Sequence, residues 1–145
     1  MLKKTFNIIT IICYISIVLF WISFLFLELY PFKPITYNNL PHKVLSKTLI
    51  GGQKVPILVN VCTTTNKSFK MTASLKNIKT TVTVSLGSVE RNILKGCQEF
   101  TSEVWTLPLN LEAGTYEIIF LTSYTYQLGR EINIPNWTEP FQVVK

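Results

Sequence analysis

The segment FKMTASLK, residues 69–76, has the clearest two-residue period in the chain and decides the fold class. Its apolar side chains are Phe69, Met71, Ala73 and Leu75. They alternate with lysine, threonine and serine side chains, so all four would lie on one face of an extended strand. This pattern predicts a strand with one face in a core and the other in solvent.

Further β-rich runs lie on both sides of this segment, and turn residues separate them. They cover residues 44–50, 55–64, 80–86, 103–109, 114–126 and 139–144. With residues 69–76 they make about seven strands, and no helical period interrupts them. The sequence therefore predicts an all-β domain, an antiparallel β-sandwich, over residues 43–145.

The most specific local motif is LEAGTY, residues 111–116. It resembles the tyrosine corner of immunoglobulin-like and fibronectin-type-III-like sandwiches, which implies that Leu111 and Tyr116 pack and that Gly114 forms the turn. The resemblance also implies that the Tyr116 hydroxyl bonds backbone across the corner. The antibody pattern places a cysteine two residues after the tyrosine, where this chain has Ile118. The resemblance therefore implies a divergent immunoglobulin-like sandwich.

Two cysteines, Cys62 and Cys97, belong to the predicted β domain. Such a pair in an exported domain favours a disulfide, with two free buried thiols as the alternative. Closing a loop of roughly 35 residues would contribute about 4 kcal/mol. Two cysteines and the single histidine, His42, do not make a zinc site, so we expect no metal.

An uncharged segment, TFNIITIICYISIVLFWISFLFL, covers residues 5–27. A helix of that length measures roughly 34 Å, which is enough to cross a bilayer core of about 30 Å. We therefore predict a cytoplasmic tip at residues 1–4 and a transmembrane signal anchor at residues 5–29. A cleavable signal peptide and a buried core helix are the alternatives, but the segment is long for either and ends without small residues.

The residues on either side of this segment predict its orientation and a stalk after it. Lys3 and Lys4 favour a cytoplasmic N-terminus and an extracytoplasmic β domain, which would be periplasmic, extracellular or luminal. Three prolines, Pro31, Pro34 and Pro41, predict an extended stalk over residues 30–42.

Four residues near the C-terminus are of types enriched at binding hot spots: Tyr124, Tyr126, Arg130 and Trp137. We expect them in a loop between the last two strands, where they would contact a protein partner. The alternative is packing in the core or at a sheet edge.

Two glycosylation sequons begin at Asn66 and Asn136. In a eukaryotic or viral setting both would be glycan acceptors in exposed loops. The alternative is that both arise by chance in a chain rich in asparagine, serine and threonine.

The composition offers little for catalysis. The eight acidic residues are all glutamates, there is one histidine, and no glycine-rich phosphate loop occurs. We therefore expect no enzyme activity, cofactor or small-molecule substrate, and no nucleic acid for a domain outside the membrane. The expected function is non-enzymatic binding or assembly, with the β domain presented to an unknown protein partner. The alternative is a structural accessory subunit of a larger membrane complex.

Overall fold

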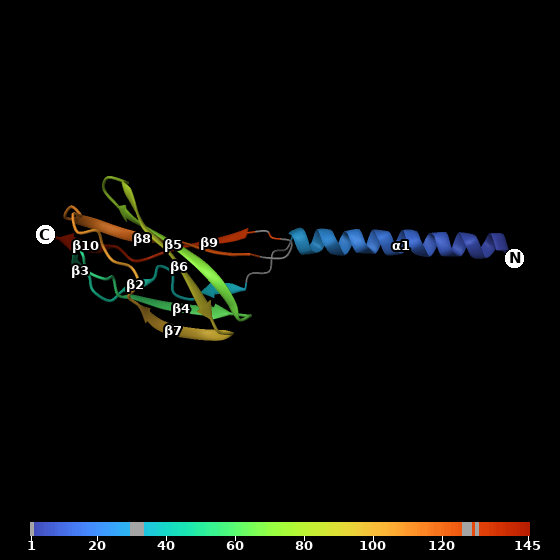
Figure 1. Cartoon of the computed structure of the whole chain (residues 1–145), viewed down its shortest axis with the longest axis horizontal. Helices are drawn as coiled ribbons and strands as arrows, with labels where there is room; N and C mark the ends of the chain where they lie inside the picture. Colours follow the sequence, from blue (N-terminus) through green and yellow to red (C-terminus); the bar gives the residue numbers. More distant parts are fainter. Residues whose placement is uncertain (1, 30–33, 126–128, 130) are drawn as a thin grey trace. The chain divides into compact units, whose positions relative to one another are not determined.

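The computed structural model describes residues 2–29, 34–125, 129 and 131–145 (Figure 1). The chain divides into two compact units, Met1–Lys33 and Pro34–Lys145. The first unit contains helix α1 (Leu2–Leu29), in which Ile9–Phe26 is long and apolar enough to cross a membrane. None of the side chains in Ile9–Phe26 is buried, which does not fit the interpretation as a core helix.

The second unit is built from strands. They are β1 (Ile35–Tyr37), β2 (Lys43–Val44), β3 (Thr48–Ile50), β4 (Ile57–Thr63), β5 (Lys67–Asn77), β6 (Thr83–Ile93), β7 (Gly96–Ser102), β8 (Gly114–Thr125), β9 (Glu131–Trp137) and β10 (Phe141–Val144). The part of the chain that the structure describes is therefore mostly β, as the sequence predicts, but with ten strands rather than about seven.

These strands form two curled sheets. In the small sheet, β4 pairs with β1 and β2 along one edge and with β7 along the other, and all three pairings are antiparallel. The large sheet has the order β3-β10-β8-β5-β6. Strand β9 pairs with the C-terminal half of β8, and β10 pairs with its first residues.

The two sheets enclose one hydrophobic core. Alternate residues of β4 are buried, and the alternation predicted for residues 69–76 places Phe69, Ala73 and Leu75 in the same core, with Met71 half-buried against it. Ile118, Phe120 and other apolar residues of the large sheet pack against these side chains. The period of two in the sequence is therefore the period of burial in the structure.

The strand predicted at residues 44–50 is divided into β2 and β3, which belong to different sheets. The strand predicted at residues 103–109 was wrong, and its neighbour was missed. Residues 103–109 form no strand, although Trp105 and Leu107 are buried and the segment bridges to Lys54 through Thr106. The strand beside β4 is β7, directly before this segment. Alternating burial gives the same sequence pattern whether or not the backbone joins a ladder, which explains the error.

The predicted stalk at residues 30–42 also needs correction from Pro34 onward. Ile35 is buried in the core, and β1 pairs with β4 between Ile35 and Thr63. His42 is buried as well. Prolines exclude helix but do not exclude short edge strands, so the proline content could not separate a stalk from the start of the domain.

Candidate functional site

Tyr116 makes a local hydrogen bond within the region of the LEAGTY motif. It lies in β8, its ring is buried, and its hydroxyl donates a hydrogen bond of 2.9 Å to the carbonyl oxygen of Glu112. Leu111 is half-buried against the core. Gly114 is the first residue of β8, and a Cβ there would lie 3.2 Å from the Asn77 side chain and 3.4 Å from the Tyr116 ring, so a larger residue would require the Asn77 side chain to shift slightly.

Cys62 and Cys97 form a disulfide, with an S–S distance of 2.00 Å. They are paired neighbours on β4 and β7, so the bond lies within the small sheet and does not join the two sheets. The prediction of a disulfide is confirmed.

The four predicted partner-binding residues do not form one site. Tyr124 is buried and packs edge-on against Phe69, with ring centroids 5.8 Å apart. Tyr126 and Arg130 lie outside the described residues. Trp137 is 43% exposed and lies in β9 rather than in a loop. Of the two that the structure describes, Trp137 is therefore the one available on the surface.

Trp137 belongs to an exposed apolar patch on the outer face of the large sheet. It is paired with Ile119, and two positions further along the same strands Pro135 is paired with Leu121, which is also 43% exposed. Because residues two apart share a face of a strand, these four side chains lie together. We call Ile119, Leu121, Pro135 and Trp137 the Trp137 patch.

The two sequons differ in their surroundings. Asn66 is exposed, and its side-chain oxygen accepts a hydrogen bond of 2.6 Å from the backbone N–H of Lys95. Asn136 has no exposed surface, and its side-chain nitrogen donates to Thr122. A glycan on Asn136 would need that nitrogen at the surface, so this fold is incompatible with the exposed acceptor loop predicted there.

Asn136 is part of a buried polar network that the sequence did not reveal. The Tyr37 hydroxyl lies 2.7 Å from Thr122 Oγ1, and Thr122 Oγ1 accepts a hydrogen bond of 3.2 Å from Asn136 Nδ2. Asn136 Oδ1 lies 3.1 Å from His42 Nε2, and His42 Nδ1 lies 3.3 Å from Asn39 Oδ1. The network joins β1 and the segment before β2 to β8 and β9, so no local spacing could have identified it.

Both ring nitrogens of His42 face carboxamide oxygens. The Asn39 amide is held in this orientation because its oxygen accepts from the backbone N–H of Asn60 and its nitrogen donates to the Leu58 carbonyl. Burial lowers the pKa of His42, and its hydrogen bonds to Asn136 and Asn39 oppose that effect. A neutral imidazole donates from one nitrogen only, so His42 can satisfy one of its two acceptors.

Tyr37, at the other end of the network, is also shifted by its surroundings. Burial raises the pKa of its hydroxyl, and the hydrogen bonds to Thr122 and Asn136 oppose that effect. The hydroxyl therefore stays protonated at neutral pH and can donate within the network.

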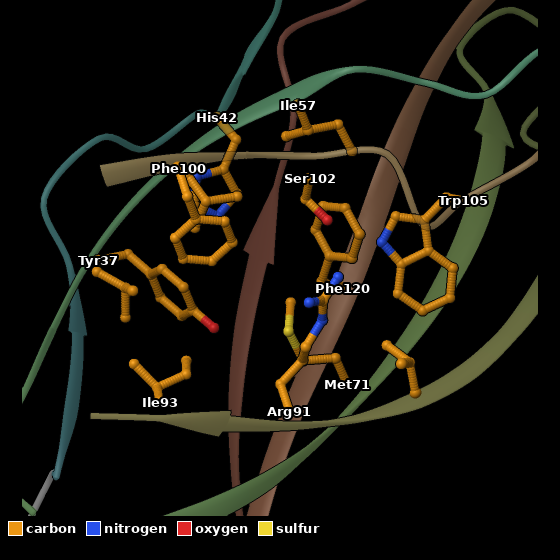
Figure 2. Close-up of a pocket in the computed structure, with 13 residues that line it drawn as sticks. Tyr37, His42, Ile57, Met71, Arg91, Ile93, Phe100, Ser102, Trp105 and Phe120 are labelled. Carbon is orange, nitrogen blue, oxygen red and sulfur yellow. The ribbon is translucent and has the colours of Figure 1, made fainter. Parts of the chain in front are cut away.

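A small cavity of about 20 Å³ lies between the sheets beside this network (Figure 2). It has room for about one water molecule. His42, Trp105 and Phe120 form its buried side, whereas Arg91 and Phe100 are half-buried members of its lining. The polar network thus borders an apolar space. Within the described residues, no cluster of three or more His, Cys, Asp or Glu side chains is placed to hold a metal.

No protein-family model and no curated protein sequence matches the chain. Among solved structures, it is similar to the C-terminal domain of Wzt, with a TM-score of 0.52 and 13% identity over 80% of this chain and 77% of that one. It also matches the Pseudomonas fluorescens alkylpurine DNA glycosylase AlkC bound to DNA containing an abasic site analog, with a TM-score of 0.45 and 10% identity over 79% of this chain and 31% of that one. The second likeness is too weak to support an argument. The first shows that this chain shares a β-rich fold with the Wzt domain, and at 13% identity it shows the fold alone.

Proposed function

We propose that this chain is a single-pass membrane protein that presents an immunoglobulin-like domain to a protein partner and has no enzymatic activity. Its helix anchors it, its N-terminus is cytoplasmic, and its β domain is extracytoplasmic. The helix Ile9–Phe26 and the flanking lysines support the anchor and its orientation. The Cys62–Cys97 disulfide is compatible with an oxidising compartment. The hydrogen bond from Tyr116 to Glu112 supports the immunoglobulin-like assignment.

The Trp137 patch is the observation that carries the binding function. Tryptophan is among the residue types that most often dominate binding free energies, and here it lies on a regular strand beside the half-exposed Leu121. A strand holds these side chains in fixed positions, so little conformational entropy is lost when a partner covers them. Burying them against a protein would remove apolar surface from water, which favours association.

Site-specific photo-crosslinking in native membranes tests this proposal. A photoreactive phenylalanine analogue at Asn133, an exposed position of β9, reports on the face that carries the patch. We expect a discrete crosslinked protein, identified by mass spectrometry, whose yield falls at least tenfold in Trp137→Ala. Leu109→Ala is the matched control, because Leu109 is 81% exposed and apolar but lies outside the patch.

The outcomes separate the possible functions. Absence of a crosslinked protein at native abundance, or equal loss in Trp137→Ala and Leu109→Ala, would contradict the binding proposal. A partner that remains in a fixed stoichiometric complex through purification would instead indicate an accessory subunit.

A separate experiment tests the orientation. A membrane-impermeant thiol reagent, applied to intact cells after reduction, should label Cys62 and Cys97. Labelling only after permeabilisation would reverse the topology.

A further inference from the structure

In the part of the chain that the structure describes, β7 has no neighbouring strand on one side, so one edge of the small sheet is open. Among the described strands β7 pairs only with β4, through seven consecutive residue pairs from Gly96 to Ser102. Cys62 and Cys97 have Cα atoms 3.9 Å apart, which identifies them as a pair of the closely spaced, non-hydrogen-bonded kind. The N–H and C=O groups of Cys97 therefore point away from β4 towards the open edge. Residues two apart repeat this direction, so the backbone groups of Glu99 and Thr101 point the same way.

The small sheet is also narrower than the large one. The small sheet is three strands wide: β1 and β2 share one edge, β4 is in the middle and β7 forms the other edge. The large sheet is five strands wide and ends at β6. Strand β6 consequently keeps apolar side chains near solvent: Val84 is 38% exposed and Val89 is half-buried. One additional strand beside β7, at a spacing of about 4.8 Å, would extend the small sheet over this uncovered part of β6.

Arg91 lies on β6 beside this uncovered region. It is half-buried and extends into the cavity between the sheets (Figure 2). Within the described residues the salt bridge joins Lys76 to Glu117, and the Arg91 side chain makes neither an ion pair nor a hydrogen bond. A guanidinium in partly apolar surroundings gains most from a carboxylate, which it can bind through two parallel hydrogen bonds.

We propose that the open edge of β7 binds an extended segment of a partner protein by strand addition, and that an acidic residue of this segment pairs with Arg91. The inference rests on the proposed function, that the domain binds a protein, and names a contact for that protein. The segment would be about seven residues long to match β7, with alternate side chains directed towards Phe100 and Val89. Strand addition satisfies the outward backbone groups of β7, and the acidic residue supplies specificity.

The charge on β7 argues against a second copy of this chain as the occupant. Glu99 is the central residue of Gly96–Ser102 and lies on the outer face of the strand. Antiparallel pairing of two β7 strands over their full length would place Glu99 opposite its own copy, and like charges directly opposite each other are unfavourable. Such pairing would also bring no carboxylate into the space beside Arg91, because Gln98, Phe100 and Ser102 are the inward residues of β7.

Binding of a matched peptide pair to the full chain in detergent micelles tests the proposal. Both probes are nine-residue peptides of alternating valine and threonine, labelled with a fluorophore. One valine position carries glutamate in the first peptide and glutamine in the second. We expect the glutamate peptide to bind at least tenfold more tightly by fluorescence anisotropy and to slow amide hydrogen exchange in Gly96–Ser102. Arg91→Gln should remove the difference between the peptides.

A variant of the edge itself provides the second measurement. Thr101→Pro removes one outward N–H without removing a bond to β4, and Thr101→Ala is its matched control. We expect binding to be lost in the proline variant and retained in the alanine variant. Folding of both is checked by formation of the Cys62–Cys97 disulfide and by circular dichroism.

The results separate this inference from the proposed function. Failure of both peptides to bind, equal affinity of the two, or slowed exchange confined to other strands would overturn strand addition at β7. If the partner crosslinked from Asn133 is still captured in Thr101→Pro, the binding function stands and this contact is wrong. If no partner is captured from Asn133 while the glutamate peptide binds at β7, the Trp137 patch fails as the binding surface and this contact stands.

Discussion

Replacing Asn136 by alanine should destabilise the β domain strongly, because Asn136 lies at the centre of the buried polar network. Its side chain has no exposed surface, its oxygen lies 3.1 Å from His42 Nε2, and its nitrogen donates to Thr122 at 3.2 Å. Asn39 Oδ1 already accepts from the backbone N–H of Asn60, which favours the His42 proton on Nε2. The substitution leaves this N–H without its acceptor, whereas Thr122 keeps Tyr37.

The expected loss is the sum of two effects. A buried polar group left unsatisfied costs about 1–3 kcal/mol, and a lost hydrogen bond costs about 0.5–1.5 kcal/mol. Together they predict a decrease of about 2–4 kcal/mol in the free energy of unfolding. For a domain of this size that corresponds to a fall of roughly 10–20 °C in Tm. A water molecule entering the space left by the amide would bring the loss towards the lower value.

Urea unfolding of the full chain in mild detergent, followed by near-ultraviolet circular dichroism, measures this change. Asn133→Ala is the matched control, because it makes the same chemical change at an exposed position of the same strand. We expect the control to change the free energy of unfolding by less than about 0.5 kcal/mol. Equal effects of the two substitutions would refute the reasoning, since they would show that the network contributes nothing measurable.

Three further predictions concern the same domain. Burial lowers the pKa of His42 below its ordinary value of 6.5, so the unfolded chain takes up a proton near pH 6.5 that the folded domain does not. The free energy of unfolding should therefore be highest above pH 6.5 and fall below that pH by at most about 1.4 kcal/mol per pH unit. In urea unfolding measured across pH, His42→Gln should remove this decrease. Replacing both Cys62 and Cys97 by alanine should lower stability by about 2–4 kcal/mol, and no change in the urea midpoint would contradict this. Tyr116→Phe should cost about 0.5–1.5 kcal/mol by removing the bond to Glu112, and an unchanged Tm would show that water replaces that bond fully.

The local patterns of the sequence predicted the features that depend on neighbouring residues. The alternation at residues 69–76 identified β5, and the β-rich run at residues 114–126 identified β8. Charge-free composition identified the helix from Ile9 to Phe26. The two cysteines predicted their bond, because the predicted β domain contains only these two.

Strand β9 lies where a loop was predicted, and its sequence contains Pro135, a residue that strands disfavour. The structure accommodates that proline because β9 has β8 on one side and, among the described strands, no partner on the other. Whether a strand is central or at an edge depends on how the sheet is assembled, which the residues of the strand alone do not show.

The sequence by itself determined an apolar N-terminal helix and a mostly β domain, since each of these is set by composition or by spacing over a few residues. Only the tertiary structure placed His42 against Asn136, a residue 94 positions away, and left the edge of β7 open beside Arg91. The physical reason is that side-chain periodicity specifies which face of a strand is buried but not which strand lies beside it. Strand order and register are fixed by packing across the whole core, and the buried network and the open edge are consequences of that order.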